Sequence, residues 1–128
     1  MQKFSKIVIC VGALIMIILG MIVYDTWKDR IYFSLAVEAV QQLKERDYKV
    51  FAIEQTEGSI SLEKFHAEPD EKIAVVFGNE VEGVGDDVLK MCDDSIEIPQ
   101  FGMKHSLNIS VAAGIVLWEL SKYKMRGF

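Results

Sequence analysis

Two short apolar segments, each followed at once by a polar, glycine-containing loop, limit most strongly what this chain can fold into. They read KVFAI (49–53) and IAVVF (73–77), and a third segment of strand length, SIEI (95–98), ends at Pro99. A strand that is apolar on both sides needs cover on both faces, as in a parallel sheet flanked by helices. We therefore expect three buried strands in one parallel sheet.

Helical patterns separate these segments. The first is expected from Ser34, as its N-cap, to about Arg46, and a short helix is expected from Asp86 or Asp87 through Met91. A third, long helix is expected from Ser106 to about Tyr123. Strands that alternate with helices predict an α/β domain with a parallel sheet.

The loops after the three strands are rich in glycine, amide and carboxylate groups. They read EQTEG (54–58), GNEVEG (78–83) and PQFGMKHSLN (99–108). Ligands of open parallel sheets bind just beyond the carboxyl ends of the strands. The three loops are therefore expected to form one composite site.

The N-terminal region carries an apolar run of a different kind. Residues 7–24 include no charged residue, and a helix of that length spans about 27 Å, the short end of what a bilayer requires. We expect residues 1–30 to be an apolar helix that anchors the chain in a membrane, and residues 31–128 to form the α/β domain. A buried element of a soluble fold and a wrongly placed gene start are the alternatives.

Charge and cysteine content exclude some classes of site. The net charge of -5 argues against RNA binding through a broad basic surface, because phosphate affinity rests on Lys and Arg. Cys10 and Cys92 form no CxxC pair, so neither a disulfide framework nor a metal site is expected.

Two long stretches of the sequence resemble a known family. VVFGNEVEGV (75–84) and IPQFGMKHSLNISVAAGI (98–115) resemble motifs two and three of SpoU/TrmH RNA 2'-O-ribose methyltransferases, which belong to the SPOUT superfamily. The resemblance extends over roughly residues 48–121. It implies a SPOUT-type parallel sheet with a C-terminal trefoil knot, partial here, which is an exception to ordinary chain topology. It also implies S-adenosylmethionine as cofactor, tRNA or rRNA as substrate, a homodimer and a cytoplasmic catalytic domain.

The resemblance assigns roles to particular residues. Gly78 would lie against the cofactor, where the lack of a Cβ permits close approach. Glu80 would act at the catalytic centre and could balance the sulfonium charge, while Ser106 and Asn108 would orient the target ribose, although Ser106 could equally be a helix N-cap. The complete set of expected cofactor contacts is Ile53, Gln55, Thr56, Gly78, Asn79, Ile98 and Leu107, and the expected catalytic residues are Glu80, Ser106 and Asn108.

The family's first motif, which includes an Asn and an Arg, has no match in this sequence. Arg30 lies in TWKDRIYF, which does not resemble that motif. The expectation is therefore an N-terminally truncated family member that keeps the cofactor site but has impaired methyl transfer. The alternative function is a non-catalytic, membrane-tethered module that binds RNA or nucleotides.

Overall fold

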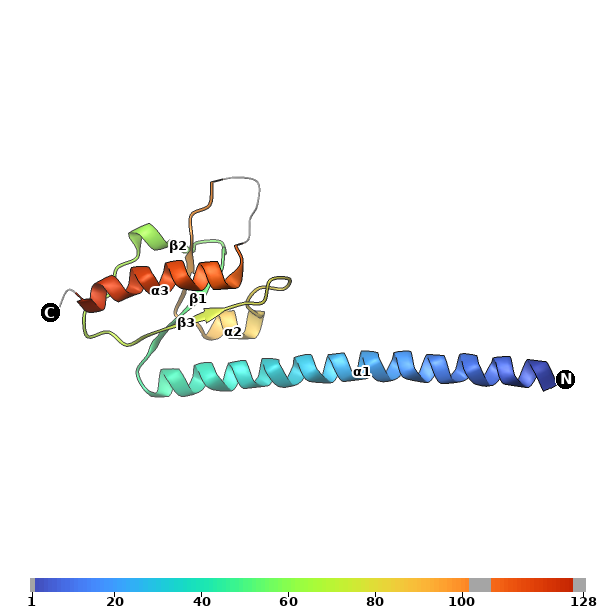
Figure 1. Ribbon diagram of the computed structural model, residues 1–128. Coiled ribbons are helices and arrows are strands. Elements are labelled where there is room, and N and C mark those ends of the chain that lie inside the picture. The colour runs from blue at the N-terminus through green and yellow to red at the C-terminus, as the bar shows by residue number, and fades with distance from the viewer. Residues whose placement is uncertain (1, 102–106, 126–128) are drawn as a thin grey trace. The chain divides into compact units, whose positions relative to one another are not determined.

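The computed structural model describes residues 2–101 and 107–125, and within these it leaves out the side chains of residues 2–15, 17, 33, 124 and 125. The chain divides into two compact units, Met1–Leu35 and Ala36–Phe128. The elements in chain order are α1 (Gln2–Glu45), β1 (Lys49–Ile53), β2 (Ile60–Ser61), the 3-10 helix η1 (Leu62–Lys64), β3 (Ile73–Phe77), α2 (Asp86–Met91), β4 (Asp94–Glu97) and α3 (Ile109–Met125) (Figure 1).

The second unit is built on a parallel sheet in the order β2-β4-β1-β3. β1 lies between β3, where Lys49 pairs with Ile73, and β4, where Phe51 pairs with Asp94. Every described pairing in this sheet is parallel. The prediction of an α/β domain with a parallel sheet is confirmed.

Alternate residues of β1 supply the two faces of the sheet, because successive side chains of a strand point to opposite sides. Val50 and Ala52 are buried in one core with Val40 of α1 and Val88 of α2. Phe51 is buried in the other core, on the opposite face, together with Ile96 of β4 and with Leu62, Phe65 and Val116. Figure 1 shows α3 on one side of the sheet, and α2 with the C-terminal part of α1 on the other.

Helix boundaries differ from those predicted. Ser34 does not cap a helix but lies inside α1, where its hydroxyl donates to the carbonyl of Ile31 at 2.9 Å. The N-cap of α2 is Gly85, not an aspartate, and it makes no side-chain capping bond. α3 begins at Ile109, and Ser106 lies outside the described residues. The start at Ser34 was misplaced because a capping residue does not begin a new helix where the sequence favours helix on both sides of it.

The apolar N-terminal run lies within α1, but the side chains of residues 7–15 are outside the description. Where side chains are described, no helix is both long enough and apolar enough to cross a membrane.

Candidate functional site

A cavity of about 310 Å³ lies at the carboxyl ends of β1, β3 and β4. The segments that follow these strands all contribute to it, as the order of strands and loops predicted. Its lining residues are Ile53, Glu54, Gln55, Phe77, Gly78, Asn79, Glu80, Val81, Glu82, Gly83, Ile96, Glu97, Ile98, Gln100, Leu107, Ile109 and Ala112.

The structure brings most of the predicted site residues together. Seven of them line this cavity: Ile53, Gln55, Gly78, Asn79, Glu80, Ile98 and Leu107. Thr56 and Asn108 are not among the lining residues, but Asn108 donates a hydrogen bond to Glu80, which is one of them. Ser106 belongs to the part of the chain that is not described. The chemical roles assigned to these residues stay predictions.

The loop after β3 folds tightly on itself. A Cβ at Gly78 would overlap the carbonyl carbon of Gly83 and the nitrogen of Val84. The sequence predicted a glycine here to admit a ligand, whereas the atoms that require it are those of the chain's own returning backbone. Gly83 has φ +70°, a conformation that residues other than glycine rarely adopt.

Asn79 gives this loop its shape. Its Oδ1 accepts hydrogen bonds from the backbone amides of Val81 at 2.8 Å and Glu82 at 2.7 Å. The carbonyl of Asn79 accepts a further bond from the amide of Gly83 at 3.1 Å. A side chain that bonds the backbone two residues ahead is the ordinary way in which asparagine forms a turn, so Asn79 acts on the cavity through the loop.

Glu80 and Asn108 join the two motifs. The carboxamide of Asn108 donates to Glu80 Oε1 at 3.4 Å, and its Oδ1 accepts from the amide of Ser110 at 2.9 Å. The second bond is the one that an N-cap residue makes to the first turn of a helix. Asn108 is therefore the N-cap of α3, a role that the sequence analysis considered for Ser106.

The cavity is lined by acidic and by apolar side chains. Glu54, Glu80, Glu82 and Glu97 contribute carboxylates. Apolar side chains include those of Ile53, Ile96, Ile98, Leu107 and Ala112. No arginine, lysine or histidine is present among the described lining residues. Such a cavity suits a ligand with a flat apolar part and a positive charge.

Several lining residues were given no individual role from the sequence, although Glu54, Glu82 and Gly83 lie in the loops that were expected to form the site. Glu54 directly follows β1, and Glu97 is the last residue of β4, so both lie at the strand ends where ligands bind. Their place at the ends of predicted strands is the sequence feature from which Glu54 and Glu97 could have been assigned to the site. Glu82 and Gly83 belong to the GNEVEG loop, but only the folded loop shows that they face the cavity.

Comparison with known proteins identifies the family. Residues 24–118 match the SpoU rRNA Methylase family. The chain belongs to this family. Its SpoU-type segments 75–84 and 98–115 are those whose described residues meet around the cavity.

Individual SpoU relatives agree with this assignment. The chain is 36% identical over 89 residues to the tRNA (guanosine(18)-2'-O)-methyltransferase of Thermus thermophilus, an alignment that covers 70% of this chain and 45% of that protein. Among solved structures, the TrmH/SpoU tRNA modifying enzyme of Aquifex aeolicus matches with a TM-score of 0.63 and 30% identity, over 71% of this chain and 45% of that one.

A second similar structure is that of an AdoMet-bound rRNA methyltransferase from Sinorhizobium meliloti. It matches with a TM-score of 0.54 and 26% identity, over 59% of this chain and 28% of that one. The chain thus spans less than half the length of each of these three relatives.

Proposed function

We propose that this chain is the cofactor-binding part of an S-adenosylmethionine-dependent RNA methyltransferase that acts on a ribose 2'-hydroxyl. The observation that carries the proposal is the cavity, because residues of two separate family motifs line it together. Its volume of about 310 Å³ lies at the lower end of the range for small-molecule sites, about 300–1,000 Å³.

The lining of the cavity fits the parts of this cofactor. Adenine requires apolar walls and backbone groups, which the segments after β1 and β4 supply. The sulfonium cation is favoured by nearby carboxylates, of which Glu80 and Glu82 lie on the loop after β3. The relative from S. meliloti is an AdoMet-bound enzyme. The relatives include both tRNA and rRNA methyltransferases, so either RNA is a candidate substrate.

Isothermal titration calorimetry on the full chain tests cofactor binding. S-Adenosylmethionine should bind with one site per chain, and its demethylated product should compete for it. ATP, which shares the adenosine but carries negative phosphates, should bind much more weakly beside the carboxylates. Absence of any heat change with both cofactor forms would refute the proposal.

A non-catalytic module that binds the cofactor, a nucleotide or RNA is the second candidate. It is the alternative that the sequence leaves open, because no stretch of it resembles the family's first motif and a ribose hydroxyl needs help to lose its proton. Transfer of labelled methyl groups from the cofactor to total tRNA and rRNA separates the two candidates. Incorporation above that of a heat-inactivated sample would establish the enzyme, and cofactor binding without incorporation would establish the module.

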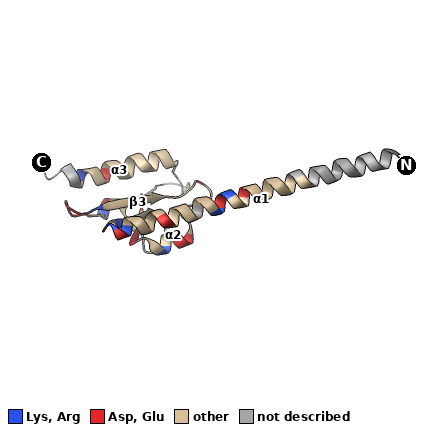
Figure 2. Ribbon diagram, turned by 90° about the horizontal axis from the view of Figure 1, so that it is seen from below, with Lys and Arg blue, Asp and Glu red and all other residues tan. Residues whose placement is uncertain are grey.

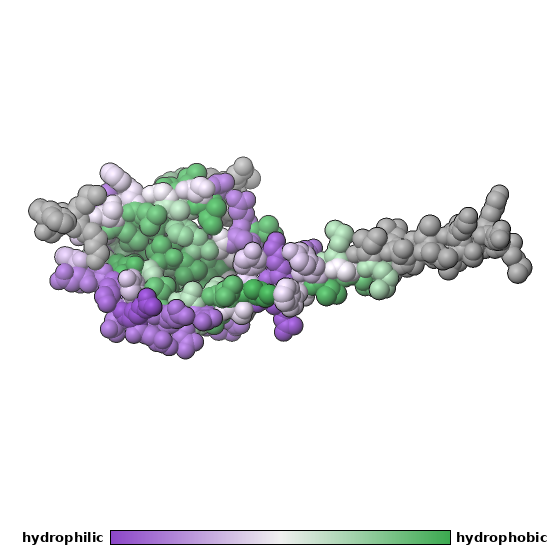
Figure 3. Space-filling model, turned by 60° about the horizontal axis from the view of Figure 1, so that its bottom comes forward, coloured by the Kyte–Doolittle hydropathy of each residue, from purple (hydrophilic) through white to green (hydrophobic). Residues whose placement is uncertain are grey.

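We also propose a homodimer that forms through α3. Val111, Ile115 and Trp118 lie on one face of this helix and are 51%, 39% and 65% exposed. Figure 2 shows few charged residues on α3. Figure 3 shows a broad apolar area on the face of the second unit that this view presents. Exposed apolar patches of this kind are typical of interaction sites. Sedimentation should give a dimer, and Trp118→Glu should give a monomer, while Lys90→Glu on α2 should not change the mass.

The proposal also includes a knot in the chain and attachment of the chain to a membrane. The SpoU resemblance implies a trefoil knot near the third motif, and a knotted chain stretched between its ends stays shorter than an unknotted chain of equal length. Force spectroscopy measures that difference.

Residues 7–24 are proposed to attach the chain to a membrane, with residues 36–128 in the cytoplasm where RNA is available.

A further inference from the structure

Glu54 connects two strands beyond the point where their pairing ends. β1 and β3 pair up to Ile53 and Phe77, and Glu54 is the next residue along the chain after β1. Its Oε2 accepts a hydrogen bond from the backbone amide of Val84 at 3.1 Å, across 30 positions of sequence. The side chain therefore reaches from the end of one strand to the far end of the loop that follows the other.

Val84 is a position where a backbone amide needs a partner. It is only 7% exposed and packs in the core between α2 and the sheet. A buried amide that has no hydrogen-bond partner in place of water destabilises the folded state. In this structure the carboxylate of Glu54 provides that bond.

The same carboxylate adds to the positive φ as a reason for glycine at position 83. A Cβ at Gly83 would meet the Glu54 carboxylate, whose Cδ would lie 3.2 Å away. A Cβ at Gly78 would overlap the backbone of residues 83 and 84. The 83–84 backbone is thus in close contact with both the Glu54 carboxylate and Gly78.

Among the described residues, no other hydrogen bond of positions 79–83 reaches β1, and the bond of Glu80 leads to Asn108, just before α3. Asn79 bonds the amides of Val81, Glu82 and Gly83, and all of these are within the loop. They determine its internal shape. The hydrogen bond that the Val84 amide donates to the Glu54 carboxylate fixes the shaped loop against the neighbouring strand, where both Glu54 and the loop line the cavity.

We propose that Glu54 is a positioning residue of the cofactor site, which holds the loop 78–84 in place as one wall of the cavity. The inference rests on the proposed function for the identity of the ligand but not for the contact itself. Its action depends on an acceptor oxygen at the right reach and not on a negative charge. Glu54→Gln should therefore retain it, because the carboxamide keeps an acceptor oxygen on a side chain of the same length, and Glu54→Ala should abolish it.

The first measurement needs no ligand. Amide hydrogen exchange of Val84, followed by NMR in the full chain, should be slow in the wild type and in Glu54→Gln. It should be at least about tenfold faster in Glu54→Ala, as expected for loss of one hydrogen bond. The matched control is Glu57→Ala, since Glu57 is exposed in the same loop and does not line the cavity. Equal Val84 exchange in wild type and Glu54→Ala would overturn the proposal.

The second measurement is the affinity for S-adenosylmethionine and for its demethylated product. Glu54→Ala should weaken binding of both by about tenfold or more, and Glu54→Gln should stay within about threefold of wild type for both. A loss in Glu54→Gln confined to the sulfonium form would overturn the positioning role in favour of a direct charge interaction. A melting temperature that falls equally in Glu54→Gln and Glu54→Ala, with affinity following it, would also overturn it.

A substitution at Gly83 adds a test of coupling. Gly83→Ala places a methyl group against the Glu54 carboxylate, so it should cost more affinity in the wild type than in Glu54→Ala, where that contact is gone. Additive effects would contradict the packing described. If the wild type binds neither form of the cofactor while Val84 exchange follows the expected pattern, the contact stands and the proposed function fails.

Discussion

At the scale of single residues, Gly78 and Asn108 each have a structural reason for their identity that is separate from ligand binding. The position of a side chain at 78 is already filled by the backbone of residues 83 and 84. Asn108 begins α3 through its bond to the amide of Ser110. Mutational effects at both positions therefore need a measure of folding beside a measure of function.

Gly78→Ala should abolish cofactor binding through a single methyl group. The added Cβ would displace the backbone of residues 83 and 84, which form part of the cavity wall. A shift of backbone in a packed region typically costs about 1–3 kcal/mol. Calorimetry with S-adenosylmethionine and thermal denaturation measure the two effects. Gly20→Ala is the control, because a Cβ there meets nothing within 4 Å, and unchanged affinity in Gly78→Ala would contradict the described loop.

Asn108→Ala should lower the free energy of unfolding by about 1 kcal/mol, the usual cost of losing an N-cap. Asn108→Asp should keep that stability, since aspartate is an equally good N-cap, but it replaces the donor to Glu80 with a second carboxylate. Urea denaturation gives the stability, and cofactor titration gives the function. If Asn108→Asp binds the cofactor as well as wild type, the contact with Glu80 has no role in the site.

Residues at the cavity could be predicted where position along the chain determines them. Gly78, Asn79 and Glu80 follow directly from the end of β3, and they line the cavity. Glu54 could not be assigned to its partner, because the bond to Val84 depends on the register of β1 with β3 and on the path of the loop. That register is a three-dimensional property, which local sequence patterns do not contain.

At the scale of elements, predictions succeeded where a segment is apolar on both sides. β1 and β3 have the predicted bounds, because all five residues of β3 and four of the five in β1 are buried or half-buried, which marks each segment off from the polar sequence around it. β2 was missed, since its two residues, Ile60 and Ser61, are too few to show a period. Its pairing with β4 is a tertiary contact that no local pattern announces.

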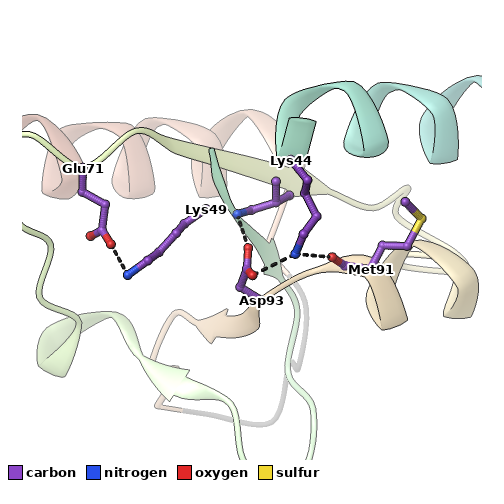
Figure 4. Close-up of polar contacts among 6 residues, drawn as sticks. Lys44, Lys49, Glu71, Met91 and Asp93 are labelled. Carbon is purple, nitrogen blue, oxygen red and sulfur yellow. Dashed lines mark hydrogen bonds and ion pairs between the residues drawn. The ribbon is translucent and has the colours of Figure 1, made fainter. Parts of the chain in front are cut away.

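Asp93 connects three elements of the second unit. Its Oδ1 accepts from Lys44 Nζ at 2.8 Å and its Oδ2 from the amide of Val50 at 2.8 Å, while Lys44 also donates to the carbonyl of Met91 at 3.0 Å (Figure 4). The ion pair of Lys49 with Glu71 lies beside this group (Figure 4). Asp93 thus ties the C-terminal end of α1 to β1 and to the segment between α2 and β4.

Asp93→Asn should destabilise the chain by about 1 kcal/mol, which is less than is usual for hydrogen bonds to charged groups because the carboxylate is partly exposed. The bond from Lys44, aided by the bond from the Val50 amide, holds the pKa of Asp93 below its usual value. Its contribution is therefore complete above the unfolded pKa of about 3.9 and is lost as pH falls through the lower folded pKa. Urea denaturation at pH 7, 5 and 3 should show a smaller acid effect in Asp93→Asn than in wild type. Asp70→Asn, at an exposed loop position, is the control, and an equal acid effect in Asp93→Asn and wild type would contradict this role.

At the scale of the whole molecule, the two units follow different sequence rules. In residues 36–128, strands and helices alternate and close around two cores, so the order of elements was enough to predict the parallel sheet and the position of the site. In the first unit an uncharged run continues into charged residues within one helix, and no break in the pattern marks the change. Helical sequence of this kind predicts secondary structure well but does not determine what covers its apolar side chains.

Attachment to a membrane is the prediction that concerns this first unit. Residues 7–24 carry no charge, and the described apolar side chains within that run, among them Met16, Met21 and Val23, are exposed. Transfer of exposed apolar surface from water into lipid is favourable. The expressed chain should therefore remain in the pellet after extraction with carbonate at high pH, and it should float with membranes on a density gradient. Leu19→Lys should release a large part of it, because a lysine at the centre of a membrane helix costs about 2.5–3.5 kcal/mol. Gln42→Lys, an exposed position in the second unit, should leave the distribution unchanged. Release of the wild-type chain by carbonate, or a pellet that does not float, would show that a protein surface and not lipid covers these residues.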